Sequence, residues 1–533
     1  MPAHALPAAP RITAGLDGAP TEVDVLVVGL GATGCGVALD AVSRGLSVLA
    51  VDAHDLAFGT SRWSSKLVHG GLRYLAHGQV GVARESAVER GLLMSRTAPH
   101  LVHPLPLLVP LTDGTRHRAA TVVRASLAAG DVLRHAAGAG AGELPRSRRV
   151  GAAEALALAP ALRPAGLRGG LLGWDGRLED DARLVTTLAR TAAQHGAHVR
   201  TRARVVEARP GSAALVDTLT GRQVEVRARL VVNATGVWAA GLDDRLHLTP
   251  SRGTHLVVRT AALGGLSTAL SVPVPGERAR FVLLLPQPDG TTYVGLTDEP
   301  APGPVPDVPE PTQGEVAFLL DVLAGVLAHP PTPADLLGAF AGLRPLLADP
   351  HAGSTGGTGD GTADLSRRHA VLVHGARAVG GARGAALVTV VGGKLTTYRR
   401  MAQDAVDAGV SAAGLSAGPC RTRTLPLSGA APRAVLASLD APARLLRRYG
   451  TDAALVLATA REVTGLDDAA LLRPASPEAP VTLAELVFGV THEGAHDADD
   501  LLDRRTRVGL VAADREVVRP LAEAALAAVA RAA

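Results

Sequence analysis

The chain has 533 residues, too many for one hydrophobic core, so two or three domains are expected. Hydrophobic residues make up 47% and charged residues 20%, as in ordinary globular proteins, and a formal net charge of only +4 gives no reason to expect a nucleic-acid partner. Two cysteines, Cys35 and Cys420, cannot build a disulfide framework or a metal cluster, so we expect a reducing, cytoplasmic setting and no metal site.

The N-terminal stretch carries no recognisable targeting signal. Residues 1–21 mix Pro, Ala and Gly without the apolar centre of a signal peptide, so they are predicted to be a disordered leader. No stretch further along has the roughly 18 apolar residues that a membrane-spanning helix needs.

A β-α-β pattern follows the leader. Val23–Val28 is a β-branched apolar run typical of a buried parallel strand, residues 37–44 favour a helix, and residues 46–51 indicate a second buried strand that ends at Asp52. Between the first strand and the helix lies the sequence GLGATG, residues 29–34, which matches the GxGxxG pattern.

This glycine-rich turn is typical of dinucleotide-binding domains. Gly29 permits a tight turn, Gly31 lets the backbone approach a pyrophosphate, and Gly34 lets the helix pack closely on the strand. The N–H groups of Ala32 and Thr33, at the start of the helix, favour phosphate oxygens. The acid at the end of the second strand can accept a proton from a ribose hydroxyl, so the whole pattern favours a bound dinucleotide over an empty turn.

The rest of the chain divides into helical and strand-like stretches. Helices are expected at residues 83–94, 180–195 and 312–327, from residue 394 onward, and through residues 432–533. Strands are expected at residues 101–111, 199–208, 230–232 and 385–391 and within residues 255–296. The Gly/Ser/Thr-rich residues 353–362 are expected to form a loop.

Two later turns favour FAD over NAD. Asn233-Ala234-Thr235-Gly236 ends one buried strand, and residues 391–397 (VGGKLTT) join another strand to a helix. A flavin dinucleotide is long, so distant loops must close over it. A helix that starts near Lys394 would direct N–H groups at the N1/C2 edge of the flavin, where negative charge accumulates on reduction.

Residues 58–75, FGTSRWSSKLVHGGLRYL, resemble a signature of the FAD-dependent glycerol-3-phosphate dehydrogenases. Further blocks follow in that family's order, at residues 98–101 (APHL), 180–185 (DDARLV), 233–238 (NATGVW), 252–255 (RGTH), 342–346 (GLRPL) and 392–399 (GGKLTTYR). The resemblance covers residues 22–515. Arg62 stands where the family usually has serine, Trp63 fills a variable position, and Arg368 replaces an acid.

The pattern and the resemblance imply an α/β fold in which a Rossmann-like FAD-binding domain with a parallel sheet is interleaved with an α+β substrate domain, followed by an all-α C-terminal domain. The FAD-binding domain would comprise residues 22–105, 165–250 and 365–415. The substrate-binding domain would comprise residues 106–164 and 251–364, and the helical domain residues 420–533.

The resemblance also implies a reaction, the oxidation of sn-glycerol 3-phosphate to dihydroxyacetone phosphate by hydride transfer from C2 to N5 of FAD. His255 is the candidate general base, with a pKa that neighbouring cations would lower. The planar guanidinium fork of arginine suits a phosphate dianion. The catalytic candidates are His255, Arg344, Lys394 and Arg73. The candidates for substrate contact are Arg73, Tyr74, Thr254, Arg344 and Arg367.

The cofactor-binding candidates come from the three glycine-containing turns and the signature segment. They are Gly29, Gly31, Ala32, Thr33, Gly34, Asp52, Thr60, Ser61, Ser64, Ser65, Lys66, Leu67, His69, Gly70, Gly71, Asn233, Ala234, Thr235, Gly236, Gly393, Lys394, Leu395 and Thr396. His492 and Glu493, in the last domain, are expected to be structural.

Three alternatives stay open at this point. The chain could be an oxidase that reduces oxygen to hydrogen peroxide, another flavoenzyme that oxidises amines or hydroxy acids, or a flavoprotein without catalytic activity. For the main hypothesis a quinone is the expected electron acceptor. The protein would then be cytoplasmic, with peripheral attachment to the inner face of the cell membrane, and it could form a homodimer.

Overall fold

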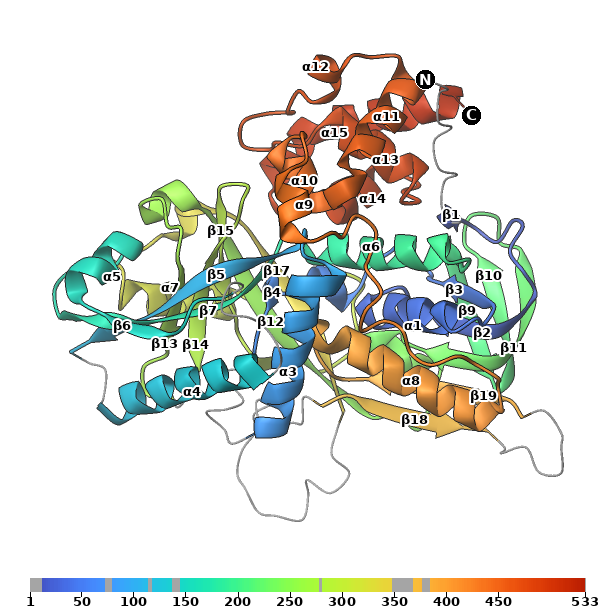
Figure 1. The fold of residues 1–533 in the computed structure, drawn as a ribbon, viewed down its shortest axis with the longest axis horizontal. Coiled ribbons are helices and arrows are strands. Elements are labelled where there is room, and N and C mark those ends of the chain that lie inside the picture. The colour runs from blue at the N-terminus through green and yellow to red at the C-terminus, as the bar shows by residue number, and fades with distance from the viewer. Residues whose placement is uncertain are drawn as a thin grey trace, which may run out of the picture.

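The computed structural model describes residues 12–71, 79–113, 117–136, 144–277, 280–347, 368–375 and 384–532. These residues form two large β-sheets that lie side by side and a helical domain that packs above them (Figure 1). The expected loop at residues 353–362 lies outside the described residues. No described helix is both long and apolar enough to cross a bilayer.

The first sheet has nine described strands around a parallel core. The parallel strands, in spatial order, are β1 (Ile12–Ala14), β8 (His198–Thr201), β3 (Val48–Val51), β2 (Glu22–Val28), β11 (Gln223–Asn233) and β19 (Ala386–Val391). Antiparallel additions are β9 (Ala203–Arg209), β10 (Gly211–Asp217) and β18 (Ala370–His374). Strands β3 and β19 are buried along their whole length, as are the last four residues of β2 and of β11, which is typical of parallel strands packed on both faces.

Three helices cover one face of this sheet: α1 (Ala32–Ser43), α6 (Asp181–Gln194) and α8 (Tyr398–Ala413), with α1 between the other two (Figure 1). Asp180 caps α6 by accepting the backbone N–H groups of Ala182 and Arg183. Nearly every residue of α6 is buried, because the helix lies between the sheet and the C-terminal domain.

The second sheet has ten described strands and is largely antiparallel. Its strands, in spatial order, are β16 (Glu299–Pro300), β12 (Leu248–Arg259), β15 (Thr291–Gly295), β14 (Phe281–Pro286), β13 (Ala269–Pro273), β5 (Val102–Thr112), β7 (Leu167–Leu178) and β4 (Leu67–Val68), with β17 (Leu336–Leu347) beside β12 and β6 (Arg148–Val150) beside β7. Helices α5 (Ala152–Leu158) and α7 (Gln313–Ala324) share a hydrophobic core with one face. Helix α4 (His117–Ala136) packs near β5 and β7, next to α3 (Val80–Leu92).

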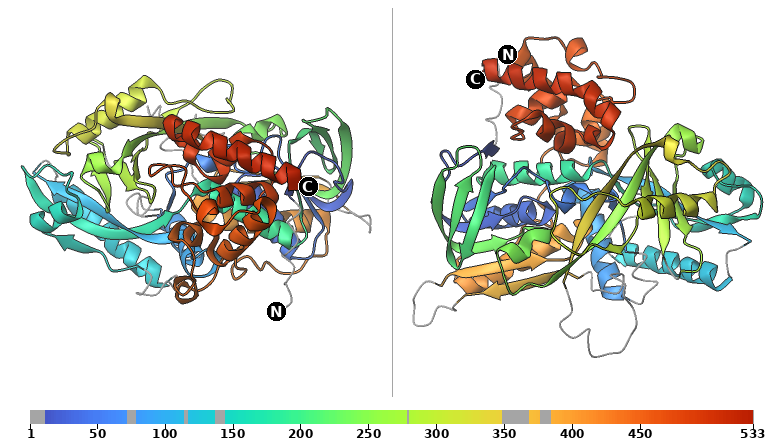
Figure 2. Two further views of the ribbon diagram at one scale, coloured as in Figure 1. Left: turned by 90° about the horizontal axis from the view of Figure 1, so that it is seen from above. Right: turned by 180° about the vertical axis from the view of Figure 1, so that it is seen from behind.

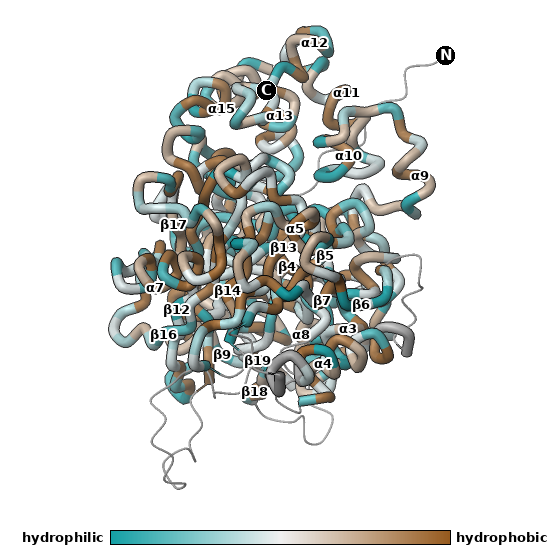
Figure 3. The backbone as a smooth tube through the Cα atoms, turned by 90° about the vertical axis from the view of Figure 1, so that its left-hand side faces the viewer, coloured by the Kyte–Doolittle hydropathy of each residue, from teal (hydrophilic) through white to brown (hydrophobic). Residues whose placement is uncertain are grey.

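The C-terminal domain is helical, as expected from its periodicity (Figure 2). Its helices are α9 (Arg433–Ala437), α10 (Ala443–Tyr449), α11 (Ala453–Thr464), α12 (Asp468–Leu471), α13 (Leu483–Thr491), α14 (Ala498–Asp500) and α15 (Ala512–Ala532). Helix α15 carries both hydrophobic and hydrophilic residues (Figure 3), and Val518, Ala522 and Ala525 recur on the buried side at helical spacing.

The α/β architecture with a helical C-terminal domain confirms the expected fold class. Three local expectations differ from the structure. Ile12–Ala14 was expected in a disordered leader but forms β1, because the segment adds in parallel to β8. Strand β7 lies within residues 165–250 but pairs with β5 in the second sheet, so we propose to assign it to the substrate-binding domain. The helix expected from Lys394 starts with a 3₁₀ turn, Leu395–Thr397.

Candidate active site

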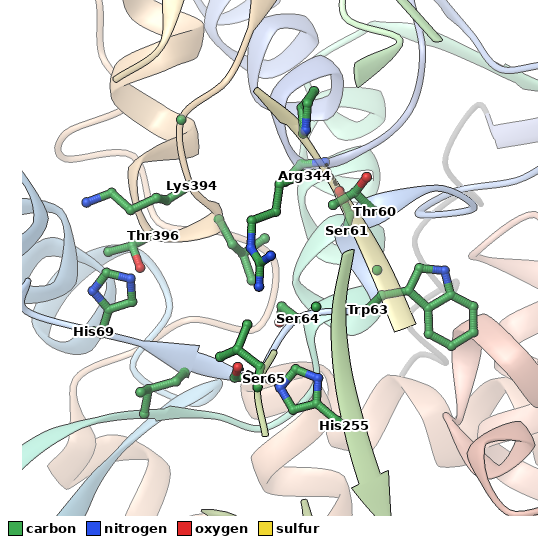
Figure 4. A pocket seen from close by; sticks show the side chains of 18 of the residues that line it. Thr60, Ser61, Trp63, Ser64, Ser65, His69, His255, Arg344, Lys394 and Thr396 are labelled. Carbon is green, nitrogen blue, oxygen red and sulfur yellow. Dashed lines mark hydrogen bonds between the residues drawn. The ribbon is translucent and has the colours of Figure 1, made fainter. Parts of the chain in front are cut away.

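A single cavity of about 1690 Å³ runs between the two sheets. It exceeds the roughly 300–1,000 Å³ of an ordinary ligand pocket, so it has room for a long cofactor together with a substrate. Most of the residues expected from the sequence line it: Gly29, Gly31, Ala32, Thr33, Asp52, Thr60, Ser61, Ser64, Ser65, Leu67, His69, Ala234, Thr235, Gly236, His255, Arg344, Gly393, Lys394, Leu395 and Thr396. Figure 4 shows Arg344 near the centre, with Lys394, Thr396 and His69 on one side and His255 and Ser65 below.

The glycine-rich turn forms one end of the cavity. Gly29 has a φ of +97°, and a Cβ on Gly34 would stand 1.7 Å from the carbonyl oxygen of Gly29. Helix α1 can therefore start this close to β2 only with glycine at residue 34. Ser61 accepts the N–H of Ala32 at 2.9 Å, at the start of the helix. This cradle of backbone N–H groups beside a helix N-terminus fits a pyrophosphate.

Asp52 follows β3 beside this turn. Its two carboxylate oxygens accept the backbone N–H groups of Leu30 and His54, each at 2.8 Å. Burial raises the pKa of Asp52 to about 6, although these two hydrogen bonds act in the opposite direction. The side chain lines the cavity and is only partly buried, so it remains able to accept a ribose hydroxyl.

His255, on β12, also lines the cavity. Its Nε2 is 2.8 Å from the hydroxyl of Ser65, and its ring stacks on Phe340 with 4.8 Å between centroids. Its Nδ1 is buried without a hydrogen-bond partner among the described residues. Burial holds the pKa of His255 well below its usual value. The positive charges of Lys66 and Arg344 lower this pKa further, as expected from the sequence, but their effect is smaller than that of burial.

Arg344 reaches the cavity from β17. Its guanidinium donates to Asp298 and to Ser251, both at 3.1 Å, and to the carbonyl of Thr297 at 3.2 Å. A Cβ on Gly253 would stand 2.2 Å from this guanidinium, so the guanidinium in this position packs against the bare backbone of a glycine. The arginine is therefore held in place on one side, while its fork lines the cavity.

Lys394 follows β19 and lines the same cavity. Its ammonium donates a hydrogen bond to Ser86, on α3. This contact draws α3 and the turn after β19 together around the cationic group.

Six of the expected residues lie behind the cavity wall: Gly34, Lys66, Gly70, Gly71, Asn233 and Thr254. Lys66 is fully buried, forms an ion pair with Asp181 at 3.1 Å, and faces the ring of Phe340 at 4.5 Å. Asn233 accepts the hydroxyl of Thr235 at 2.7 Å and so holds the turn after β11. The side chains of Lys66 and Asn233 therefore support the cavity wall from behind and do not form its surface.

Thr254 faces away from the cavity because side chains alternate along a strand. Gly253 and His255 line the cavity, so the residue between them has to point to the opposite face of the sheet. The alternation of side chains along a strand predicts this orientation from the sequence alone. Trp63 also lines the cavity, as does Trp238, and neither was among the expected site residues.

Arg73, Tyr74 and Arg367 lie outside the described residues. Their assigned roles in substrate binding stay predictions. The described part of the cavity contains Arg344 and Lys394 as cationic groups near His255 (Figure 4).

Comparison with known proteins agrees with this geometry. Residues 24–399 match the family model described as FAD dependent oxidoreductase, and residues 420–532 match the C-terminal domain of alpha-glycerophosphate oxidase. Glycerol-3-phosphate dehydrogenase 1 of Mycobacterium tuberculosis (strain H37Rv) is 50% identical over 520 residues, 96% of either chain. Glycerol-3-phosphate dehydrogenase 2 of the same strain is 38% identical, covering 96% of this chain and 85% of that protein.

A solved structure extends the likeness to three dimensions. The glycerol-3-phosphate dehydrogenase from Bacillus halodurans, complexed with FAD, is 26% identical, with a TM-score of 0.68 over 96% of this chain and 92% of that one. The dinucleotide cradle, the buried histidine and the central arginine thus occur in a chain that resembles these enzymes along nearly its whole length. The chain belongs to the FAD-dependent glycerol-3-phosphate dehydrogenases.

Proposed function

We propose that the chain oxidises sn-glycerol 3-phosphate to dihydroxyacetone phosphate, with hydride transfer from C2 to N5 of FAD and a quinone as the next electron acceptor. One observation carries this proposal: a dinucleotide cradle and a buried His255–Arg344 site share a single cavity. When bound, FAD supplies the hydride acceptor. The relatives that are 50% and 38% identical bear the name of this activity, which supports the same substrate.

Arg344 holds the phosphate in this proposal. Its ion pair with Asp298 orients the guanidinium, so little side-chain entropy is lost when substrate binds. A charge-assisted hydrogen bond contributes about 1.5–3 kcal/mol, so two of them distinguish glycerol 3-phosphate from glycerol by roughly two to four powers of ten. Arg73, Tyr74 and Arg367 are the proposed additional contacts.

His255 removes the proton of the C2 hydroxyl. Its lowered pKa keeps the imidazole neutral at physiological pH, which is the state that a general base needs. Ser65 orients the ring through its contact with Nε2. The Lys394 ammonium is the proposed stabiliser of negative charge at the flavin edge.

An apolar part of the cavity supports a quinone as acceptor. Leu283 lies opposite Gly295, which in turn lies opposite His255, so it is two strands, or roughly 10 Å, from the base. Val109, Leu127 and Phe281 extend this apolar lining toward α4. A planar apolar acceptor suits such a surface better than a charged one.

Oxygen is the second candidate acceptor, because the C-terminal residues match a domain named after an oxidase. Steady-state assays with glycerol 3-phosphate decide between the two. A short-chain quinone analogue should support turnover with little peroxide. Peroxide formed in a one-to-one ratio with product, without quinone reduction, would contradict the proposal. Sarcosine and D-amino acids serve as control substrates and should not be oxidised.

A membrane-borne quinone would require contact with the cytoplasmic face of the cell membrane. We therefore expect the purified protein to sediment with vesicles that contain anionic lipid. Protein that remains in the supernatant would contradict membrane attachment. A homodimer stays a prediction, which sedimentation velocity tests directly.

A further inference from the structure

The loop after β3 is held by the helical domain through a buried cluster of charges. Asp55 is fully buried and receives both terminal nitrogens of Arg505 at 2.8 Å, together with Nε of Arg504 at 2.5 Å. Arg504 also pairs with Asp500. These two arginines follow α14, more than four hundred residues along the chain from the loop that they hold.

The same cluster reaches the loop by a second path. Arg202, at the junction of β8 and β9, donates to Asp497 at 2.7 Å and to Asp500 at 2.9 Å. Its backbone N–H donates to the carbonyl of His54 at 2.9 Å. Asp55, Arg504, Asp500, Arg202 and His54 therefore form a closed ring of contacts between the helical domain and the loop.

This loop is part of the cavity wall. Asp52, Ala53, His54 and Phe58 all line the cavity, at the end that contains the glycine-rich turn. Asp55 itself points away, into the charge cluster. The helical domain thus touches the back of a loop whose front is built to receive the ribose of a dinucleotide.

We propose that Arg504 and Arg505 are positioning residues for FAD: by anchoring Asp55, they fix the loop that presents Asp52 to the cofactor. This inference rests on the proposed function, because it takes FAD as the ligand of the cavity. The C-terminal domain would thus help to retain the cofactor through Asp55, on the far side of the loop from the cavity.

A purely structural role predicts something different. Arg190 on α6 and Asp452 at the start of α11 also join the helical domain to the first sheet, with an ion pair of 2.8 Å. This pair contacts no residue of the β3 loop among the contacts described. If the Asp55 cluster served only to hold the domains together, breaking either ion pair would have the same consequence for FAD.

The test compares Asp55→Asn with Asp452→Asn. Each variant removes one carboxylate charge at a domain contact and keeps the shape of the side chain. Holoenzyme is diluted into flavin-free buffer well below its unfolding temperature, and the rise of free-flavin fluorescence gives the rate of FAD release. Asp55→Asn removes the charge that Arg504 and Arg505 both contact, which should speed FAD release by about tenfold or more. Release from Asp452→Asn should stay within about twofold of the unchanged protein.

KM for glycerol 3-phosphate, measured with excess FAD, should not change in either variant, because the substrate end of the cavity is not touched. If Asp55→Asn does not yield folded holoenzyme, Arg504→Gln replaces it, since the bidentate Arg505 contact remains. Equal release rates in the tested variant and the unchanged protein would overturn the inference, as would equally fast release from Asp452→Asn. Unchanged protein that binds no flavin would instead refute the proposed function.

Discussion

His255 combines deep burial with a ring that lines the cavity, and both features suit the general base that we propose it to be. Its neutral form is favoured because there is little water to solvate the imidazolium. The ring is held by Ser65 and by stacking on Phe340.

His255→Gln should lower kcat by about 100- to 10,000-fold, because a positioned general base contributes this much to proton transfer. Flavin content should stay normal, since the dinucleotide cradle is untouched. His374→Gln is the matched control, because His374 pairs with Asp243 and does not line the cavity. Near-normal turnover in His255→Gln would show that the histidine is not the general base.

FAD retention should depend on pH through Asp52. Burial raises the pKa of Asp52 to about 6, so the carboxyl takes up a proton as the pH falls through that value. The protonated acid accepts a ribose hydroxyl less well, and FAD release should become faster from pH 7.5 to pH 5, an interval that extends about one pH unit or more on either side of this pKa. Fluorescence of released flavin measures the rate.

Asp52→Asn provides the control for this pH dependence. FAD release from this variant should be fast at both ends of the pH range and nearly independent of pH, because the titrating carboxyl group is gone. A pH-dependent rate that survives in Asp52→Asn would assign the effect to another group.

At the scale of single residues, the sequence predicted which residues lie close together, but not always which way their side chains point. His255, Arg344 and Lys394 come from three distant motifs and line one cavity, where the family resemblance predicted a common site. Lys66 lies in the same signature as Ser65, yet it is buried behind the wall by Asp181, a partner more than a hundred residues away. Short-range pattern cannot reveal such a pairing.

At the scale of elements, the strand–turn–helix unit at the N-terminus depends on close packing. The start of α1 approaches the end of β2 so closely that any side chain at residue 34 overlaps the carbonyl of Gly29. The positive end of the helix dipole and the N–H groups of the first turn are thereby brought to the place where a pyrophosphate would bind.

Gly34→Ala should yield protein that is folded poorly or lacks flavin, because its Cβ would be 1.7 Å from the Gly29 oxygen and the helix would have to shift. Gly151→Ala is the control, with no neighbouring atom within 4 Å of the added carbon and a negative φ of −74°. Absorbance of bound flavin and thermal unfolding of both variants check the prediction. A Gly34→Ala protein with full flavin content would show that the turn tolerates a side chain.

The elements themselves were largely predictable where periodicity was strong. Helix α6 and strands β2 and β3 lie where the apolar pattern put them. Strand β1 was missed because Ile12–Ala14 is too short to show a pattern and is stabilised by pairing with β8, nearly two hundred residues later. The assignment of β7 to the second sheet likewise depends on its partner β5.

At the scale of the whole molecule, the two sheets supply different halves of one site. The parallel sheet contributes the dinucleotide cradle and Asp52, while the antiparallel sheet contributes His255 and Arg344. The helical domain was predictable as a separate unit, but its contacts were not. The ion pairs of Arg183 with Glu493 and of Arg505 with Asp55 join residues about three hundred or more positions apart, and only the fold reveals them.

FAD and glycerol 3-phosphate are proposed to meet in this cavity for hydride transfer. Anaerobic mixing of the holoenzyme with glycerol 3-phosphate tests it most directly, with visible flavin absorbance as the signal. The absorbance should bleach completely, with one dihydroxyacetone phosphate formed per flavin, and more slowly when C2 carries deuterium. Absorbance that persists unchanged at saturating substrate would contradict the account.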